Sequence, residues 1–476
     1  MRASGAQTST GAPEPVLNGT LEHEGMQLSV ALAHATRLSL FIQISGQTGG
    51  VSHIPDRTVF PRLTVTLGER TVEMGRCQLY VEYTRKGGDG RLVFLDDIYD
   101  CRALVFDQKL VNLKTYFRNL PVVLGQKERI KPEFREYVSA LTYDLSVFKK
   151  FFNEQDRVLA NEPPAVARAG QDALLRTEGR EFLKFFDTTL EQLGKIVQGF
   201  DKEEHERHGF YLRRQVWDFI LASEFLKRTN LKPRGYAGDA EMMQMTYENQ
   251  YVGNYVFNKL LHKHPLETPS AHAVRNRRRF IPRCVRASLA RFPDPTQKLK
   301  VLSVACGPAW ELQDMFHDSS DFQRLQCTLL DQDPHALDIA REGIRRIEAA
   351  RDIELGVRFI SESVRTMLRE RNMKDRFGSQ HFIYSMGLFD YLTPPVARAL
   401  ARKIFDLLEP GGTMVIGNFH LDNPTRYYME YWMDWVLYYR TADDMKDLVA
   451  DLPGAQASLS YDESGCQMFL HVEKQA

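Results

Sequence analysis

Two residues that each follow a short apolar run, a glycine and an aspartate, could together bind a nucleotide. Gly307 comes just after the apolar run in residues 301–305, and Asp331 follows the next such run, at 327–330. A glycine between a buried strand and a helix permits a tight turn, where a ligand can approach bare backbone. An acid at the end of the next strand is where a doubly wound sheet holds ribose hydroxyls. The spacing therefore predicts that Gly307 and Asp331 lie at one edge of a sheet, beside a nucleotide.

The elements needed to position these residues alternate between strand and helix. Short apolar runs at 301–305, 327–330, 357–360, 382–385 and 413–416 have the length of buried parallel strands. Helical spacing separates them at 310–316, 336–344 and 395–408, and Glu-Pro-Gly-Gly at 409–412 indicates a turn. The pattern predicts an α/β fold with a Rossmann-like sheet in residues 279–476.

Four segments of this region resemble the class I S-adenosylmethionine-dependent methyltransferases, in the right order and at the right separations. They are S-V-A-C-G-P-A at 303–309, L-L-D-Q-D-P at 329–334, S-M-G-L-F-D-Y-L at 385–392 and L-E-P-G-G at 408–412. The resemblance covers roughly residue 279 to the C-terminus. It implies S-adenosylmethionine as cofactor and a small-molecule methyl acceptor.

The resemblance also implies where the cofactor lies. The loop at Gly307 approaches the methionyl part, Asp331 holds the ribose, and Ser363 and Val364 edge the adenine. Acceptors approach near Met386, Phe389 and Tyr391. The cofactor set in these strand-end loops is Ala305, Cys306, Gly307, Pro308, Asp331, Gln332, Ser363, Val364, Ser385, Met386 and Gly387.

The first motif departs from the family pattern. Ser303 stands where an acid is common, and Ala305 and Ala309 replace glycines, which we expect to narrow the loop only slightly. The missing acid implies that another segment helps to hold the amino-acid end of the cofactor. We expect the loop at 234–239 to do so, with Arg234 facing the methionyl carboxylate or the substrate and Tyr236 beside it. The alternative for this loop is a plain helix–helix connection capped by Asp239.

Two other interpretations of the sheet stay open. An NAD site requires Gly-x-Gly-x-x-Gly, and here only the middle glycine, Gly307, is present, between Ala305 and Trp310. Tryptophan does not permit the close helix–strand approach that the last glycine allows, so methyl transfer is favoured. The other alternative is a non-catalytic protein that senses the cofactor or another nucleotide.

The chemistry of methyl transfer decides which side chains could be catalytic. Transfer from a sulfonium depends mainly on holding acceptor and methyl group in line, and a base is needed only if the acceptor starts protonated. Asp390 or Tyr391 could orient an acceptor, and His420 is the candidate base. A histidine on a loop is more often only a hydrogen-bonding residue, which is the alternative for His420.

The acceptor is suggested by two further segments. Residues 426–439 are dense in aromatic side chains and predict a helix that covers an apolar or aromatic acceptor, or else forms a dimer surface. R-G-Y-A-G-D at 234–239 together with 385–392 resembles a bacterial group described as making the methyl ester of 3-hydroxypalmitic acid. That resemblance implies a fatty-acid carboxylate, already ionised, which needs no base. N- or O-methylation of another small metabolite is the alternative.

Residues 25–120 are β-rich, with predicted strands at 38–44, 63–67, 77–83 and 92–95 and hairpin turns at 68–70 and 86–90. A small barrel or sandwich is expected. V-E-M-G-R-C-Q-L-Y-V-E at 72–82 is similar to the middle of a PilZ domain, which often binds cyclic di-GMP. Arg70 and Val72 stand where such a domain carries its Asp and Ser, so a barrel used for docking or dimerisation is the alternative.

Residues 121–278 are predicted to be a helical linker and lid region. Helical spacing covers 131–153, 182–200, 212–226 and 241–261, and the prolines in 161–167 indicate a linker. Six arginines lie across the end of the region, and we interpret them as a solvated helix face paired with local acids, rather than a nucleic-acid site, because the whole chain is neutral. They are Arg275, Arg277, Arg278, Arg279, Arg283 and Arg286.

Composition limits the partners. Lys plus Arg and Asp plus Glu both total 62, so no global field favours nucleic acid. The six cysteines are scattered without a C-x-x-C pair, which is typical of reduced thiols in the cytoplasm and predicts no metal site. No run approaches the roughly 20 apolar residues of a membrane span. Residues 1–24 are expected to be a disordered tail, and a homodimer is compatible with the sequence.

Overall fold

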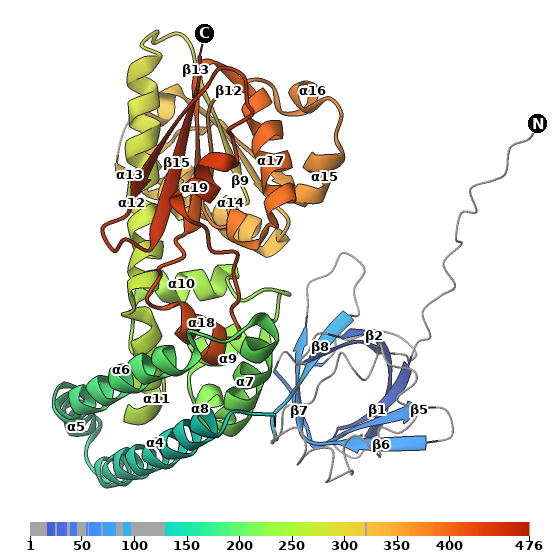
Figure 1. Ribbon diagram of the computed structural model, residues 1–476, viewed down its shortest axis with the longest axis vertical. Helices are drawn as coiled ribbons and strands as arrows, with labels where there is room; N and C mark the ends of the chain where they lie inside the picture. The colour runs from blue at the N-terminus through green and yellow to red at the C-terminus, as the bar shows by residue number, and fades with distance from the viewer. Residues whose placement is uncertain are drawn as a thin grey trace, which may run out of the picture. The chain divides into compact units, whose positions relative to one another are not determined.

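The computed structural model describes residues 17–23, 26–35, 39–44, 54–55, 57–67, 70–81, 89–96, 129–318 and 321–475. Contacts divide the chain into two compact units, one of Met1–Pro132 with Pro233–Gly235 and one of Glu133–Lys232 with Tyr236–Ala476. In Figure 1 the strands of the first unit are blue, and the second unit runs from cyan to red. The expected division at 278–279 falls inside helix α12, Pro269–Arg291.

The N-terminal unit is an antiparallel sheet, with strand order β4-β7-β8-β3-β2-β1-β5-β6. The described residues form no pairing between the edge strands β4 and β6, so a closed barrel is not established. Strand β1 begins at Leu17, so the expected disordered tail does not reach residue 24. The strands are β1 Leu17–His23, β2 Met26–Ala35, β3 Ser39–Ile44, β4 Val59–Phe60, β5 Leu63–Leu67, β6 Arg70–Met74, β7 Cys77–Val81 and β8 Asp89–Phe94.

The predicted hairpin between residues 63–67 and the next strand is confirmed, because β5 and β6 pair antiparallel with Leu67 opposite Arg70. Residues 68–69 and 86–88 of the expected turns lie outside the described residues. Alternate side chains such as Leu63 and Val65 are buried in one core, as the period of two requires. The PilZ-like role of this unit stays a prediction.

The helical part of the second unit precedes the second sheet. The continuous helix predicted at 241–261 is wrong, because Asn249 (φ 51°) and Gly253 (φ 140°) end one helix before the next begins. The single helix predicted at 212–226 is likewise three, and Ser223 caps the last. The helices are α4 Pro132–Leu159, α5 Pro164–Arg176, α6 Glu178–Val197, α7 Lys202–Gln215, α8 Trp217–Ala222, α9 Glu224–Leu231, α10 Ala240–Glu248, α11 Val256–Leu266 and α12 Pro269–Arg291.

The second sheet has seven strands in the order β11-β10-β9-β12-β13-β15-β14. The five predicted strands are present and parallel, and an antiparallel pair, β14 and β15, adds the far edge. The first five follow the 3-2-1-4-5 order of a doubly wound sheet. They are β9 Leu299–Val304, β10 Leu325–Asp331, β11 Val357–Ser361, β12 Gln380–Ser385 and β13 Leu408–Phe419, followed by β14 Ala455–Tyr461 and β15 Gln467–Lys474.

Helices cover both faces of this sheet (Figure 1). Val301 and Leu329 pack into a core with α12, α13 and α14, while their neighbours Leu302 and Leu330 pack into a second core with α17. Two buried faces explain why the strands are apolar without alternation. The remaining helices are α13 Trp310–Asp318, α14 Pro334–Arg351, α15 Val364–Arg369, α16 Met373–Phe377, α17 Pro394–Asp406, α18 Arg426–Trp432 and α19 Ala442–Asp447.

The strands and helices bear on the turn, the membrane spans and the cysteines considered in the sequence. The turn expected at 409–412 lies within β13, as an irregularity where pairing with β12 shifts register and Gly411 adopts φ 77°. Within the described ranges, no helix is long and apolar enough to cross a membrane. The five cysteines in those ranges are all free thiols.

Candidate functional site

The order of strands in the second sheet reverses between β9 and β12. From β9 the chain proceeds to β10 and β11 on one side, and from β12 it proceeds to β13 on the other. Ligands of open α/β sheets bind at the carboxyl ends of the strands at such a switch point. The loop after β9 and residues 385–387 at the end of β12 meet there, so the fold brings these predicted cofactor residues together.

The loop after β9 has an unusual backbone. Ala305, Gly307 and Ala309 have φ values of 57°, 55° and 50°. This left-handed conformation is open to glycine but costs other residues roughly 1–2 kcal/mol. The expectation that the two alanines merely narrow the loop is therefore incomplete, because each also holds a strained backbone. Such strain clusters at functional sites.

Asp331 is fixed against this loop at the end of β10. Its Oδ2 accepts a 2.7 Å hydrogen bond from the backbone N–H of Gly307, and its Oδ1 accepts one of 2.9 Å from the N–H of Asp333. Asp331 is buried, and burial raises the pKa of its carboxyl group. The Cys306 N–H also donates to the Leu330 carbonyl at 3.0 Å. The predicted adjacency of Gly307 and Asp331 is thus present.

The residues expected at the adenine lie beside Asp331. Strand β11 pairs with β10 so that Ser361 is opposite Asp331. Ser363 follows and caps α15, its Oγ accepting a 3.2 Å hydrogen bond from the Arg365 N–H. Val364 begins that helix and packs against the core. These positions place the backbone and side chains of 363–364 at the outer end of the same sheet edge.

The loop at 236–239 is a helix–helix connection, and its role as a lid over the cofactor stays a prediction. Asp239 caps α10 through a 3.0 Å hydrogen bond from the Met242 N–H and pairs with Arg228 at 2.7 Å, so the helix connection is confirmed. Tyr236, however, lies within electrostatic range of Asp331. Burial, and next the charge of Asp331, raise the pKa of the Tyr236 phenol. Arg234 belongs to the other unit together with Pro233 and Gly235, and its contact with the cofactor or the substrate stays a prediction.

Tyr391 meets two distant segments. Its hydroxyl accepts a 2.8 Å hydrogen bond from Nε1 of Trp435. A Cβ added to Gly238 would lie 3.0 Å from the Tyr391 hydroxyl and 3.0 Å from a Trp435 ring carbon. Burial raises the pKa of Tyr391, so the phenol is neutral at physiological pH. Tyr391 is therefore placed beside the loop that carries Tyr236.

Asp390 supports the backbone rather than facing an open site. Its Oδ1 accepts a 2.8 Å hydrogen bond from the Phe419 N–H, and the side chain is buried. Arg440 donates to the Phe389 and Leu392 carbonyls, at 2.8 and 2.7 Å, on either side of it. Burial raises the pKa of Asp390 to about 6. These contacts fit a bracing residue for the segment that carries Tyr391.

His420 lies towards the antiparallel edge of the sheet. Its Nδ1 accepts a 3.2 Å hydrogen bond from the Asp422 N–H, and its ring meets Tyr461 edge-on at 5.9 Å. Its backbone N–H donates to the Cys466 carbonyl at 2.7 Å. Within the described chain, none of its hydrogen bonds or ring contacts joins it to Tyr391 or to the loops after β9 and β12. Its role as a base stays a prediction.

Arg277 is a site residue that the sequence interpretation missed. Its Nη1 donates to the Met386 carbonyl at 3.0 Å, and the side chain borders Gly387. The solvated face predicted for the arginines holds for Arg278, bound to Asp314 at 2.5 and 2.6 Å. It is wrong for Arg277. Helical spacing from the buried Val274 and Ile281 could have placed position 277 on the inward side.

Glu311 was missed as well. It lies in the first turn of α13, and its Oε1 accepts a 2.7 Å hydrogen bond from the hydroxyl of Tyr384. Strand pairing places Tyr384 directly opposite Ser303. Burial raises the pKa of Glu311. An acid in a first helical turn usually complements the helix dipole, so no sequence signal singles this one out.

The aromatic segment at 426–439 is mostly core. Helix α18 ends at Trp432, which is buried and packs edge-on against Phe186 at 5.0 Å. Tyr428 contacts the same ring at 5.9 Å. The continuous helix expected over 426–439 is therefore wrong, and its role as a cover for the acceptor or as a dimer surface stays a prediction. Trp435, after the helix, reaches Tyr391. Beneath Trp435 is an apolar cavity of about 20 Å³, bordered also by Phe225, Val274, Phe419, Met429 and Met433.

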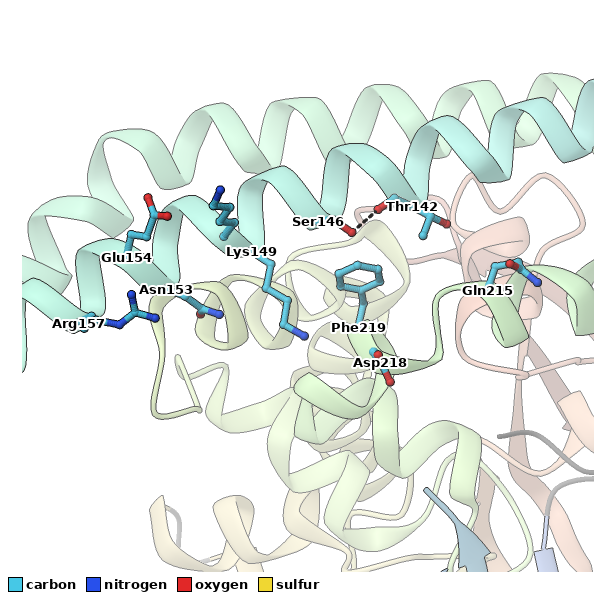
Figure 2. Close-up of a pocket in the computed structure, with 10 residues that line it drawn as sticks. Thr142, Ser146, Lys149, Asn153, Glu154, Arg157, Gln215, Asp218 and Phe219 are labelled. Carbon is cyan, nitrogen blue, oxygen red and sulfur yellow. Dashed lines mark hydrogen bonds between the residues drawn. The ribbon is translucent and has the colours of Figure 1, made fainter. Parts of the chain in front are cut away.

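A separate hollow of about 590 Å³ lies in the helical region, between α4 and α8 (Figure 2). Lys149 extends from α4 towards Phe219, with its ammonium 5.5 Å from the ring centre. The hollow is open and polar, and none of the residues predicted for the site borders it. The strand ends remain the place where the predicted residues meet.

Comparison with known proteins does not assign a family. No family model matches the chain, and no curated protein matches it. A possible exported protein from Bordetella parapertussis is 18% identical, with 62% of this chain and 96% of that chain covered and a TM-score of 0.43. Magnesium protoporphyrin IX methyltransferase (ChlM) from Synechocystis PCC 6803 with bound SAH is 10% identical, with 43% and 87% covered and a TM-score of 0.33.

N-methyltransferase NodS from Bradyrhizobium japonicum WM9, in complex with S-adenosyl-l-homocysteine, is 13% identical, with 42% of this chain and 88% of that chain covered and a TM-score of 0.31. Likenesses at these identities and TM-scores carry no argument about this chain.

Proposed function

We propose that this chain is an S-adenosylmethionine-dependent methyltransferase whose cofactor lies across the carboxyl ends of β9 and β10. The observation that carries the proposal is the carboxylate of Asp331, held by the N–H groups of Gly307 and Asp333 at the switch point of the sheet. A carboxylate fixed there can accept hydrogen bonds from ribose hydroxyls with the oxygen lone pairs that remain.

The buried polar atoms around the switch point fit such a ligand. The hydroxyls of Ser303 on β9 and Ser385 on β12 are buried, and the Ser385 hydroxyl has no hydrogen-bond partner among the described residues. A buried hydroxyl without a partner costs roughly 1–3 kcal/mol. The acids Glu311 and Asp331 also favour a cation such as a sulfonium. Gly307 would lie at the methionyl part, and Ser363 and Val364 at the adenine.

The cofactor, when bound, supplies an electrophilic methyl group. The chain's own contribution is to hold the acceptor and exclude water. Tyr236 and Tyr391 stay neutral because burial raises the pKa of both phenols, so each can orient an acceptor as a hydrogen-bond donor. We place the acceptor beside Tyr391, and propose that Asp390 only braces that segment.

A carboxylate acceptor, such as a hydroxy fatty acid, is the narrower form of the proposal. It needs no base, so this form of the proposal gives His420 no catalytic role. The cavity of about 20 Å³ under Trp435 holds roughly one water molecule. An acyl chain would therefore enter there only after Trp435 or Met433 moves. A compact N- or O-acceptor would require no such movement.

The test is calorimetric titration of the full chain with S-adenosylmethionine and S-adenosylhomocysteine. We expect the wild type to bind both, and Asp331→Asn to weaken both by roughly tenfold to a hundredfold, since a charged hydrogen bond contributes about 1.5–3 kcal/mol. The exposed Asp422→Asn is the control and should bind as the wild type. Absence of binding by the wild type would overturn the proposal.

Catalysis is then tested by incubating the protein and the cofactor with a cell extract. We expect a product heavier by one methylene group that is not formed by Asp331→Asn. Binding without any such product would instead indicate a protein that senses the cofactor without turnover.

A further inference from the structure

Glu311 and Arg277 bring two opposite charges to the switch point without neutralising each other. Arg277 is half-buried and, among the described residues, forms no ion pair within 4.0 Å of a carboxylate. Glu311 likewise has no ion pair there, and its one side-chain hydrogen bond comes from Tyr384. Leaving charges unpaired at a partly buried site is costly, so a ligand that pairs with both would be favoured.

The charges of Arg277 and Glu311 lie within electrostatic range of each other. Arg277 is among the charges that lower the pKa of Glu311, against the larger effect of burial. Arg277 and Glu311 also both act on the phenol of Tyr247, which packs edge-on against Trp310 at 5.1 Å. A carboxylate and a guanidinium therefore converge from α13 and α12 on one place, next to the loop after β9.

Glu311 lies near the place where the first motif lacks an acidic residue. Ser303 lacks the carboxylate that the methyltransferase resemblance leads us to expect at the end of β9. Tyr384 lies opposite Ser303 in the sheet, and its hydroxyl holds Glu311. Helix α13 thus supplies a carboxylate near the end of β9, where the strand itself has Ser303.

We infer that Glu311 and Arg277 form a two-point receptor for a zwitterionic α-amino-acid group, with Glu311 accepting from the ammonium and Arg277 donating to the carboxylate. This inference rests on the proposed function, because the methionyl end of S-adenosylmethionine is the zwitterion that would lie there. The guanidinium has five N–H donors, so it keeps donors for a carboxylate while Nη1 binds the Met386 carbonyl and Nη2 contacts the Met243 sulfur at 3.5 Å.

The experiment compares S-adenosylhomocysteine with 5′-methylthioadenosine, which has the same nucleoside and thioether but no amino-acid group. Titrations use the full-length wild type, Glu311→Gln, Arg277→Met and the control Arg286→Met. Arg286 lies on the same helix but pairs with Asp321 at 3.0 Å, on the exposed surface. We expect the first two variants to lose at least tenfold in affinity for S-adenosylhomocysteine and to bind methylthioadenosine within twofold of the wild type. The control should bind both unchanged.

A milder variant covers the case in which a charge change disturbs folding. Tyr384→Phe keeps the ring but removes the hydroxyl that holds Glu311, and should weaken S-adenosylhomocysteine alone, by roughly threefold to tenfold, since a hydrogen bond contributes about 1 kcal/mol. If the variants weaken both ligands equally, or neither, the two-point receptor is overturned while the proposed function stands. If the wild type binds neither ligand, the proposed function fails and the receptor with it.

Discussion

The indole Nε1 of Trp435 donates a 2.8 Å hydrogen bond to the hydroxyl of Tyr391, although the two residues belong to different loops after strands of the sheet. Gly238, from the helical region, occupies the space directly beside this pair. The contact joins the loop that carries Tyr236 to the segment proposed to orient the acceptor. Its tightness can be tested with a single methyl group.

Gly238→Ala should destabilise the protein by about 1–3 kcal/mol, because its Cβ would lie 3.0 Å from both the Tyr391 hydroxyl and the Trp435 ring. The measurement is urea-induced unfolding at equilibrium. Gly199→Ala is the matched control, since no atom lies within 4 Å of its added Cβ. We expect that control within about 0.5 kcal/mol of the wild type. Equal effects of both substitutions would show that the packing at Gly238 is loose.

Ala305→Gly and Ala309→Gly should each leave stability unchanged or raise it by up to about 1 kcal/mol. Relief of the strained left-handed backbone offsets the entropy that glycine adds to the unfolded chain. Thermal unfolding of each variant measures the effect. Ala340→Gly, within helix α14, is the contrast and should cost about 1 kcal/mol or more. A comparable loss of stability at position 305 or 309 would show that alanine is not strained there.

Asp390 should make the protein less stable as pH rises from about 4 to 6. The folded state holds the proton of this buried carboxyl up to a pKa of about 6, whereas the unfolded chain releases it near the ordinary value of 3.8. The unfolded state therefore binds fewer protons in this window, and stability falls by roughly 1.4 kcal/mol per pH unit until the folded group ionises. Below both pKa values this stabilising contribution is complete and no longer changes with pH.

Asp390→Asn removes this titration and keeps an oxygen for the Phe419 N–H. Urea unfolding of both proteins at several pH values between 4 and 7 isolates the effect, because other titrating groups act on both. We expect the variant to gain stability relative to the wild type as pH rises, by about 3 kcal/mol in total. Parallel curves would mean that the carboxyl is ionised throughout.

Trp432→Ala should destabilise the second unit by about 3–5 kcal/mol, as expected for a large aromatic residue lost from a core. Val436→Ala, four residues later and 65% exposed, should change stability by less than about 0.5 kcal/mol. Equilibrium unfolding distinguishes the two. A small loss of stability in Trp432→Ala would instead favour a role for residues 426–439 as a ligand cover or a dimer surface.

Much of the second sheet follows from local sequence. The apolar runs that end before Gly307 and at Asp331 have the length of buried strands, and both elements form where expected. Helix ends were harder to predict. Asn249 interrupts a helical pattern at a single left-handed residue, which apolar spacing does not reveal. The antiparallel pair β14 and β15 went unpredicted, because its exposed edge strand β14 has no buried stripe.

By itself, the sequence determined which residues stand at the strand ends, because a strand and the turn after it depend on neighbours in the chain. Gly307 and Asp331 are in that class. Only the tertiary structure decided that Arg277 turns inward, that Glu311 meets Tyr384, and that the His420 ring accepts a hydrogen bond from the Asp422 N–H. The physical reason is that a charged side chain takes its role from the groups that surround it in space, and sheet order, not sequence distance, selects those groups.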